Sequence, residues 1–328
     1  QLVISPGRPT QDSISLSATT LNIDGGNYDG VETTLTVRAA DRMGNIVADG
    51  TTINFITEGA QIIGETSTVV GGTGTTQSTC STVKGACSVT LVSAEKRPRG
   101  DSEPSGLATA NRVTVTAYAL GEESFVDVNG NDVWDAGETW DDLGDVFIDN
   151  NENKTWEQGE QSVLFSPTNS NISACPPLPA NGKLDNAASR AGTCDGVWGA
   201  ADVRRSMVIV LSGNTAQTDT PGLALPMHLN CSATFPVRVF DQYGNPMAAG
   251  STLSITNANV TDSSFRAGTA LECAGFSPPT CNVPAPVSAT VTVDPTAVGN
   301  TNAAGGTYHY VQITGPLPCR APVSGNFN

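Results

Sequence analysis

The sequence feature that most constrains the fold is a pattern that occurs twice between residues 125 and 160. In each copy, oxygen-bearing side chains occupy positions 1, 3, 5, 9 and 12 of a twelve-residue segment, and the copies are 22 residues apart. A Phe precedes each segment by two residues, a Trp stands at position 8 and a Gly at position 11. The first copy comprises Asp127, Asn129, Asn131, Asp135 and Glu138, and the second comprises Asp149, Asn151, Asn153, Glu157 and Glu160. This spacing favours two loops that each curl around a centre lined with oxygen atoms.

Such a centre suits Ca²⁺, a hard cation that takes six to eight oxygen ligands at about 2.3–2.6 Å. Alternate side chains point inward, position 7 adds a backbone carbonyl (Val133 and Thr155), and the carboxylate at position 12 supplies two oxygens. The sequence therefore predicts two or more Ca²⁺ ions. Asp141, Asp142 and Asp145 lie between the loops, where they either complete one of the two shells or hold a third ion.

Each loop resembles the calcium loop of EF-hand, dockerin and thrombospondin type 3 repeats. The resemblance implies calcium binding at the positions named above. Both loops depart from the EF-hand pattern at position 6, where Asp132 and Lys154 replace the usual glycine. A lysine inside the loop would weaken cation binding, so the second site is the weaker prediction. No amphipathic helical pattern flanks either loop, and we therefore expect calcium loops without the helices of an EF-hand.

Charge is concentrated in the same segment. Residues 122–160 contain thirteen Asp and Glu and one Lys, a net charge of −12 out of −16 for the whole chain. These carboxylates repel one another unless cations neutralise them. A solvated acidic linker is the alternative interpretation, but it explains the charge and not the repeat. The acidic balance argues against nucleic acid as a partner, and without a run of 18 apolar residues we expect no membrane insertion.

The chain has eight cysteines, no C-x-x-C pair and two histidines, a pattern that favours disulfides over a zinc site. Disulfides indicate an oxidising compartment, so we expect an extracellular or cell-surface location. Other connectivities stay open, but the positions of the cysteines suggest the pairs Cys80–Cys87, Cys175–Cys194, Cys231–Cys319 and Cys273–Cys281.

A second internal repeat joins residues 37–55 and 237–255, which match without a gap at an offset of 200. Each copy reads as an alternating strand, a D-x-x-G-N turn and a second alternating strand, which predicts a hairpin. The shared residues are Val37, Arg38, Asp41, Gly44, Asn45, Ala48, Gly50 and Thr52, each repeated 200 positions later.

This repeat resembles the group 1 bacterial Ig-like domains of invasin and intimin, which implies β-sandwiches strung along a bacterial surface protein. We therefore predict an all-β chain of two Ig-like β-sandwiches joined by an irregular insert that contains the calcium loops and a disulfide. The predicted segments are an N-terminal strand or linker (1–11), a first Ig-like domain (12–120), the insert (121–200) and a second Ig-like domain (201–328) that starts with the strand 203–211.

No catalytic motif is present, so we expect no enzyme. The sequence favours a calcium-stabilised filament or stalk subunit of a bacterial surface, whose partners are copies of itself or other surface proteins. Residues 2–4 or the C-terminal tail would add a strand to a neighbouring subunit. One alternative is an adhesin segment that binds a glycan or host receptor through Trp134, Trp140, Trp156 and Trp198, although these rings suit burial between the loops as well. The other alternative is an accessory region of a secreted hydrolase.

Overall fold

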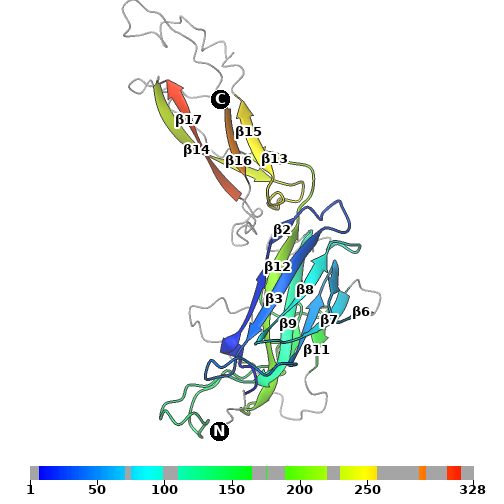
Figure 1. The fold of residues 1–328 in the computed structure, drawn as a ribbon, viewed down its shortest axis with the longest axis vertical. Coiled ribbons are helices and arrows are strands. Elements are labelled where there is room, and N and C mark those ends of the chain that lie inside the picture. Colours follow the sequence, from blue (N-terminus) through cyan, green and yellow to red (C-terminus); the bar gives the residue numbers. More distant parts are fainter. Residues whose placement is uncertain are drawn as a thin grey trace, which may run out of the picture.

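The computed structural model describes residues 7–70, 75–98, 110–164, 175, 189–219, 230–256, 288–292 and 309–318. The described residues contain strands, one 3₁₀ turn (η1, Gln11–Ser13) and no α-helix (Figure 1). The prediction of an all-β fold is confirmed. None of the described residues belongs to a helix long and apolar enough to cross a membrane.

The N-terminal half of the structure is a β-sandwich of two sheets. The first sheet has the order β1 (Ile14–Ala18), β3 (Glu32–Ala39), β8 (Ala86–Val92), β5 (Gln61–Ile63). The second has the order β2 (Asn22–Ile23), β12 (Ala200–Leu211), β9 (Arg112–Glu122), β4 (Thr52–Thr57), β7 (Thr75–Ser81), β6 (Thr66–Val70). Neighbouring strands are antiparallel except for the parallel pair of β2 and β12. The buried residues 9–11 enter this sandwich, where Thr10 bridges Glu122.

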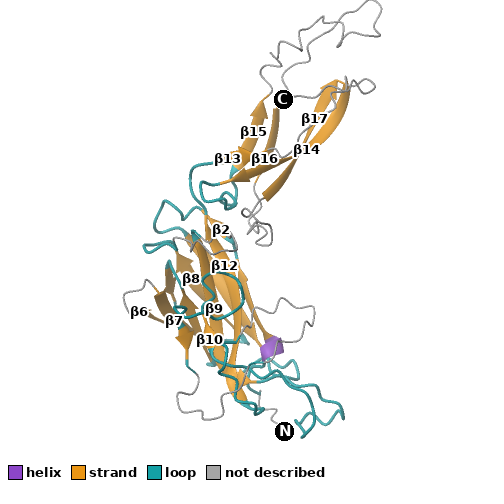
Figure 2. Ribbon diagram, turned by 180° about the vertical axis from the view of Figure 1, so that it is seen from behind, coloured by secondary structure: helices purple, strands orange, loops and turns teal. Residues whose placement is uncertain are grey.

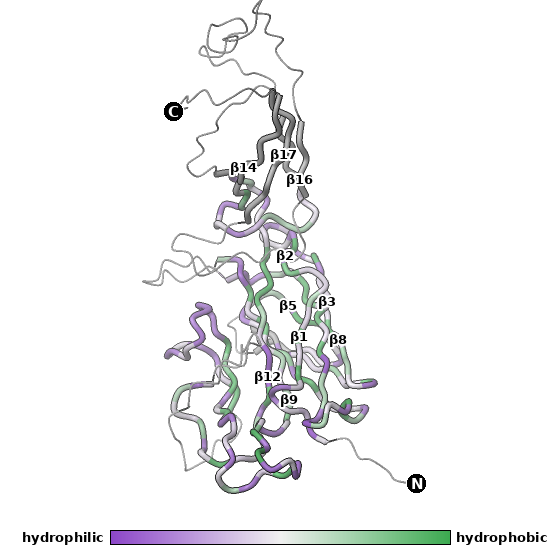
Figure 3. The backbone as a smooth tube through the Cα atoms, turned by 90° about the vertical axis from the view of Figure 1, so that its left-hand side faces the viewer, coloured by the Kyte–Doolittle hydropathy of each residue, from purple (hydrophilic) through white to green (hydrophobic). Residues whose placement is uncertain are grey.

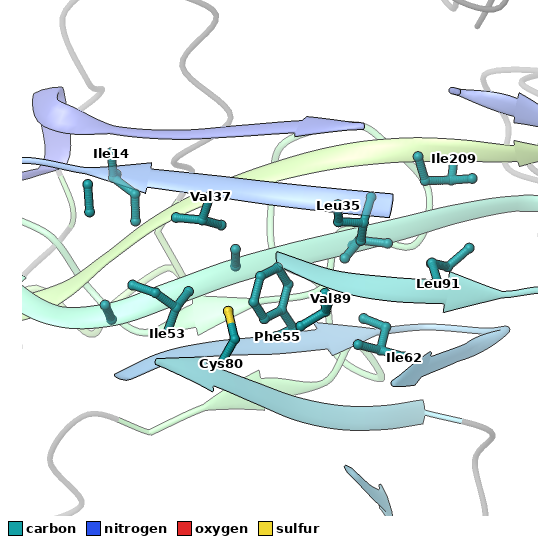
Figure 4. Packing of buried hydrophobic residues seen from close by; sticks show 14 of the residues in the cluster. Ile14, Leu35, Val37, Ile53, Phe55, Ile62, Cys80, Val89, Leu91 and Ile209 are labelled. Carbon is teal, nitrogen blue, oxygen red and sulfur yellow. The ribbon is translucent and has the colours of Figure 1, made fainter. Parts of the chain in front are cut away.

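The core fills the space between the two sheets, as Figure 4 shows around Phe55. Alternating residues of β3, Leu35 and Val37, are fully buried and face Phe55 of β4 and Val113 of β9. This alternation is the period of a strand with one face on a core. Burying each such apolar side chain stabilises the fold by about 1.5–3 kcal/mol.

The prediction that residues 203–211 start the second domain is wrong. They belong to β12, which pairs with β9 from Ala200 opposite Glu122 to Val210 opposite Arg112. Residues 121–200 are therefore not a spacer between two domains. They leave the first sandwich at the end of β9 and return to the neighbouring strand of the same sheet. Sequence patterns alone could not place β12, because its partner strand is separated from it by the whole insert.

The predicted hairpin is also wrong in its pairing. The D-x-x-G-N turn follows β3, but β4, the next strand, lies in the opposite sheet. The chain crosses between the sheets at a second tight turn, where Gly50 has a φ of 86°. The N–H of Gly50 donates to the carbonyl of Thr82, so the chain after this turn does not pair with β3. The repeat in the C-terminal part behaves alike, with β14 (Asn230–Phe240) and β15 (Thr252–Thr256) in different sheets.

The C-terminal part contains two small sheets, which lie beyond the β2 end of the sandwich (Figure 1). One has the order β13 (Gln217–Asp219), β14, β17 (His309–Pro318), and the other pairs β15 with β16 (Ser288–Thr292). The second D-x-x-G-N turn contacts the sandwich, where the hydroxyl of Ser212 donates to the carbonyl of Pro246 at 2.8 Å.

The insert packs on the outer face of β9 and β12. β9 is buried on both faces along most of its length, because one face meets the core and the other meets the insert. Within the insert, β10 (Val146–Phe147) pairs with β11 (Ser162–Val163), and Val146 and Ile148 pack on Ile56 of the sheet. Loops of the insert extend past the sandwich at the end that bears the N-terminus (Figure 2), and they include strongly hydrophilic stretches (Figure 3).

Candidate metal centre

Both twelve-residue loops are closed by short antiparallel pairing. In the first loop the N–H of Val126 donates to the carbonyl of Thr139 at 2.9 Å, next to a bridge between Phe125 and Trp140. In the second, the N–H of Ile148 donates to the carbonyl of Gln161 at 2.9 Å, next to the β10–β11 pair. Each loop is therefore the tip of a small β-hairpin, in agreement with the expectation that no helices flank it.

The carboxylate at position 1 organises the backbone of each loop. Its Oδ2 accepts the N–H of position 6 at 2.7 Å in both loops, for Asp127 and for Asp149. Its Oδ1 accepts the N–H of position 5, at 3.3 Å in the first loop and 3.0 Å in the second. An Asp that binds nearby backbone N–H groups in this way stabilises a tight turn.

Positions 3, 5 and 9 converge in both loops. The side-chain amides of Asn129 and Asn131 donate to Oδ2 of Asp135 at 2.7 and 2.8 Å. Those of Asn151 and Asn153 donate to the carboxylate of Glu157 at 2.6 and 2.7 Å. The loops share this arrangement although position 9 is Asp in one and Glu in the other, so the convergence follows from the backbone and not from one side-chain length.

The carboxylate at position 12 closes each loop. One oxygen of Glu138 accepts the N–H of position 2 at 2.8 Å and the other accepts the N–H of position 9 at 2.9 Å. Glu160 makes the same two bonds, both at 2.9 Å. The Trp at position 8 donates its indole N–H to the carbonyl of position 12, at 3.3 and 3.4 Å. Hydrogen bonds therefore link all five repeated positions within each loop.

The departure from glycine at position 6 does not disturb the loops. Asp132 and Lys154 have φ values of 63° and 65°, the left-handed conformation that normally favours glycine. Both contribute only a backbone N–H to the loop and both are exposed. Lys154 is exposed, so water screens its charge. That the second site is the weaker one stays a prediction.

The second loop is anchored to the sandwich by buried polar contacts. Arg112 of β9 binds Glu152, at position 4, through two bonds: Nε to Oε1 at 2.5 Å and Nη2 to Oε2 at 2.9 Å. The side chains of this ion pair are 3% and 10% exposed. Two residues along β9, the hydroxyl of Thr114 donates to the carbonyl of Asp149 at 3.0 Å. The outer face of β9 thus fixes the start of the second loop.

The first loop is held from a different side. Arg42, in the first D-x-x-G-N turn, donates to the carbonyl of Asp132 and lies 4.9 Å from the centre of the Phe125 ring. Trp134 stacks on Trp198 at 5.7 Å, and the ring of Trp140 meets Trp134 edge to face at the same distance. This aromatic cluster ties the first loop to the end of the insert.

Burial distinguishes the electrostatics of the two loops. Burial raises the pKa of Glu160 to about 7, and the neighbouring charges of Asp149 and Glu157 add to the rise. Burial also raises the pKa of Asp149. In the exposed first loop the N–H of Asp132 lowers the pKa of Asp127. The second loop therefore crowds carboxylates in a half-buried place, an arrangement that a divalent cation would stabilise.

The donor set of each loop fits Ca²⁺. Among the described residues, no three acidic, histidine or cysteine side chains form a metal centre by themselves. Each loop instead offers three carboxylates together with two side-chain amides, which present oxygen after a rotation about their last torsion, and a backbone carbonyl at Val133 or Thr155. A set made only of oxygen atoms suits calcium and does not suit the nitrogen and sulfur preferences of zinc.

The three acidic residues between the loops contact other parts of the insert. Oδ2 of Asp142 accepts the N–H of Gly196 at 2.9 Å. Oδ2 of Asp145 lies 3.5 Å from Arg190, whose guanidinium stacks over the Trp156 ring at 4.6 Å. The backbone N–H of Asp141 donates to Ser124 at 2.9 Å. These contacts fasten residues 141–145 to the start and the end of the insert and do not place them in either loop.

Sequence reasoning missed the residues that fasten the insert to the sheet. Arg204 of β12 is 1% exposed, and its Nη1 donates to the carbonyl of Gly144 at 2.8 Å while Nη2 donates to Ser189 Oγ at 2.7 Å. Glu123, at 3% exposure, accepts the N–H groups of Leu143 and Gly199, and burial raises its pKa to about 8. The available signal was in β9, where Arg and Thr alternate with Val and Ala from Arg112 to Ala117, so that its second face is polar. No such pattern marks Arg204 or Glu123.

Two of the suggested disulfides are present. Cys80 of β7 pairs with Cys87 of β8 and so links the two sheets, and Cys175 pairs with Cys194 within the insert. The other two suggested pairs involve Cys319, Cys273 and Cys281, which lie outside the described residues, so they stay predictions.

Comparison with known proteins adds no family assignment. No protein-family model matches the chain. No curated protein sequence matches it either.

Proposed function

We propose that this protein is an extracellular, calcium-stabilised structural protein of a bacterial surface, in which two loops of the insert each bind one Ca²⁺. The observation that supports this proposal most strongly is the shared hydrogen-bond framework of the two loops at positions 1, 3, 5, 9 and 12. Two segments of different sequence adopt it 22 residues apart, as expected if both were selected for one ligand.

Calcium bound there would stiffen the insert against the sandwich. The second loop is joined to β9 by Arg112 and Thr114, so order imposed on the loop passes directly to the sheet. Ligand binding stabilises the folded state according to the ratio of ligand concentration to Kd. With millimolar extracellular calcium and a Kd of about 0.1 mM, the gain is about 1.4 kcal/mol for each site.

The same properties suit a filament or stalk subunit built from Ig-like domains. Disulfides and the lack of a membrane-crossing helix among the described residues are compatible with an exported protein. Assembly would use strand addition by residues 2–4 or by the C-terminal tail, and both lie outside the described residues.

Calcium titration of the purified chain, together with negative-stain imaging, tests this function. We expect a stoichiometry of two ions, a higher melting temperature in calcium, and fibres that fragment or soften when a chelator is added. A chain that binds no calcium and melts at the same temperature with and without chelator would refute the calcium role. Single particles in both conditions would refute the filament.

The adhesin alternative needs an exposed aromatic patch. Trp134, Trp140 and Trp198 instead pack on one another and on Phe125, and each of them is half-buried. This packing favours a structural role for these rings. The rings do not lie between the two loops, since Trp156 of the second loop contacts Arg190 and not this cluster.

A further inference from the structure

The two D-x-x-G-N segments have the same local structure. We call residues 41–50 turn 1 and residues 241–250 turn 2. In each turn the Asp N–H donates to the Asn carbonyl at 2.8 Å, and the Gly N–H donates to the Asp carbonyl at 3.0 Å. In each turn the Asp carboxylate also accepts the N–H of a glycine from the segment that leads into the domain. Gly7 donates to Asp41 at 3.1 Å and Gly213 donates to Asp241 at 2.7 Å. Turn 2 is therefore a valid template for turn 1.

Turn 2 docks on the end of the sandwich. The side-chain amide of Asn22, at the start of β2, donates to the carbonyl of Met247 at 2.9 Å, and the Asn22 carbonyl accepts the N–H of Ala249 at 2.8 Å. The side-chain amide of Asn245 donates to the carbonyl of Ala110, just before β9, at 2.7 Å. These contacts bury Asn245 completely and leave Ala248 8% exposed. The end of one β-sandwich thus covers the turn of the next domain.

Turn 1 lacks such a cover in the described structure. Asn45 and Ala48, the equivalents of the buried residues of turn 2, are exposed. Ile46 and Met43 are also exposed, at 55% and 56%, and so is Val83 beside them at 64%. Apolar side chains grouped at one end of a domain commonly mark an interaction site.

The two turns lie at opposite ends of the sandwich. Turn 1 is beside Glu122, because Thr10 bridges Glu122 and donates its N–H to Ala40. Turn 2 is beside Ala110, at the other end of β9. An eleven-residue strand spans roughly 36 Å. A partner bound at turn 1 would therefore lie at the end of the sandwich opposite to the C-terminal domain, along the same long axis.

We propose that turn 1 is a docking surface for a second copy of this chain, which covers it with the far end of its C-terminal domain as the sandwich covers turn 2. This inference rests on the filament function proposed above and names its contact surface. A contact between unlike surfaces forms a ring or an open filament, depending on whether its rotation closes. Because turn 1 and the C-terminal domain lie at opposite ends of one axis, we expect repetition to produce an open linear assembly.

The residues before the two entering glycines support the same geometry. Gly213 follows the apolar run 207–211, which is the end of β12 and lies in the sheet of the sandwich that covers turn 2. Gly7 follows a similar apolar run at residues 2–4. Residues 2–4 lie outside the described residues, so the strand addition that the sequence predicts for them stays a prediction.

Turn 1 is also joined to the first calcium loop, because Arg42 bridges turn 1 to Asp132 and Phe125. A loop held in one conformation would therefore also fix the side chain of Arg42 in turn 1. We expect calcium to strengthen association of the wild-type chain.

Sedimentation equilibrium of the full chain in calcium tests the proposal. We expect Ile46→Glu to raise the Kd of self-association by at least about tenfold, because it places a charge where turn 2 buries an apolar surface. The matched control is Ile63→Glu on the edge strand β5, whose side chain is 47% exposed and far in sequence from turn 1. This control should associate like the wild type. Equal melting temperatures of the two variants would show that neither change unfolds the sandwich.

Three results would overturn the docking proposal. They are a wild-type chain that stays monomeric up to about 1 mM, unchanged association of Ile46→Glu, and equal loss in both variants. Calcium binding measured on the same samples keeps the two proposals separate. A chain that binds two calcium ions but does not associate refutes the docking surface alone. A chain that associates through turn 1 without binding calcium refutes the calcium role alone.

Discussion

The buried ion pair between Arg112 and Glu152 provides the sharpest test of how the second twelve-residue loop is held. In the Glu152→Ala variant, the guanidinium of Arg112, at 3% exposure, would lose its carboxylate partner. Removing one member of a buried pair typically costs about 3–5 kcal/mol, because a charge stays buried without compensation. A loss of about 4 kcal/mol lowers the ratio of folded to unfolded insert by roughly a thousandfold.

The matched control is Glu95→Ala. Glu95 also binds an Arg, at 2.8 Å, but its side chain is 77% exposed. Exposed pairs contribute about 0.2–1 kcal/mol, so this variant should differ little from wild type. Urea unfolding followed by tryptophan fluorescence suits the measurement, because all four Trp residues lie in the insert.

A loss below about 1 kcal/mol in Glu152→Ala, or a loss equal to that of Glu95→Ala, would refute the reasoning. Replacing both Arg112 and Glu152 by Leu should recover much of the loss, since apolar groups of similar size often substitute for a buried pair without penalty. Failure of this double variant to recover any stability would mean that the single change acts through something other than an unpaired charge.

Three further predictions concern the insert. Arg204→Met should destabilise the insert by about 3 kcal/mol through the loss of bonds from a buried guanidinium, and faster amide hydrogen exchange near residues 144 and 189 would show it. Glu123 has a pKa of about 8 in the folded state, above the unfolded value of 4.5, so only the folded state keeps the proton between these pH values. The free energy of unfolding should therefore fall by about 1.4 kcal/mol per pH unit as pH rises from 4.5 to 8. Melting of the Glu123→Gln variant, measured across this range, should lack that pH dependence. Asp127→Ala and Asp149→Ala should each reduce the calorimetric calcium stoichiometry from two to one, and an unchanged stoichiometry in either would contradict the assigned loop.

The sequence was most informative where the determinants are local. The two twelve-residue loops were predicted from spacing alone. In the structure, hydrogen bonds link their repeated positions because each loop builds its shape from its own Asp, Asn and Glu side chains. That they bind calcium stays a prediction. The D-x-x-G-N turns were recognised for the same reason, since Asp41 and Gly44 fix the turn within five residues.

Contacts between distant segments could not be predicted in the same way. β12 has the apolar alternation of any sandwich strand, and its partner β9 is 77 residues away across the insert, so the pattern fitted the second domain equally well. The strands around the repeated turns fit a hairpin by pattern, and only the crossover at Gly50 separates them. Arg204 and Glu123 are charged, and charge alone indicates the surface; their burial depends on an insert that folds back over the sheet.

The return of the insert to its point of departure has a consequence for protein engineering. Glu122 and Ala200 face each other on paired strands, so a tight turn of two residues could replace residues 123–199 without altering the strand order. The outer face of the sheet that this change uncovers bears Arg112, Thr114 and Thr116, which tolerate water. It also uncovers Ile56 and Tyr118, which the insert packs against and which would need polar replacements. The sandwich thus offers a site where the whole insert can be removed or exchanged while the scaffold keeps its topology.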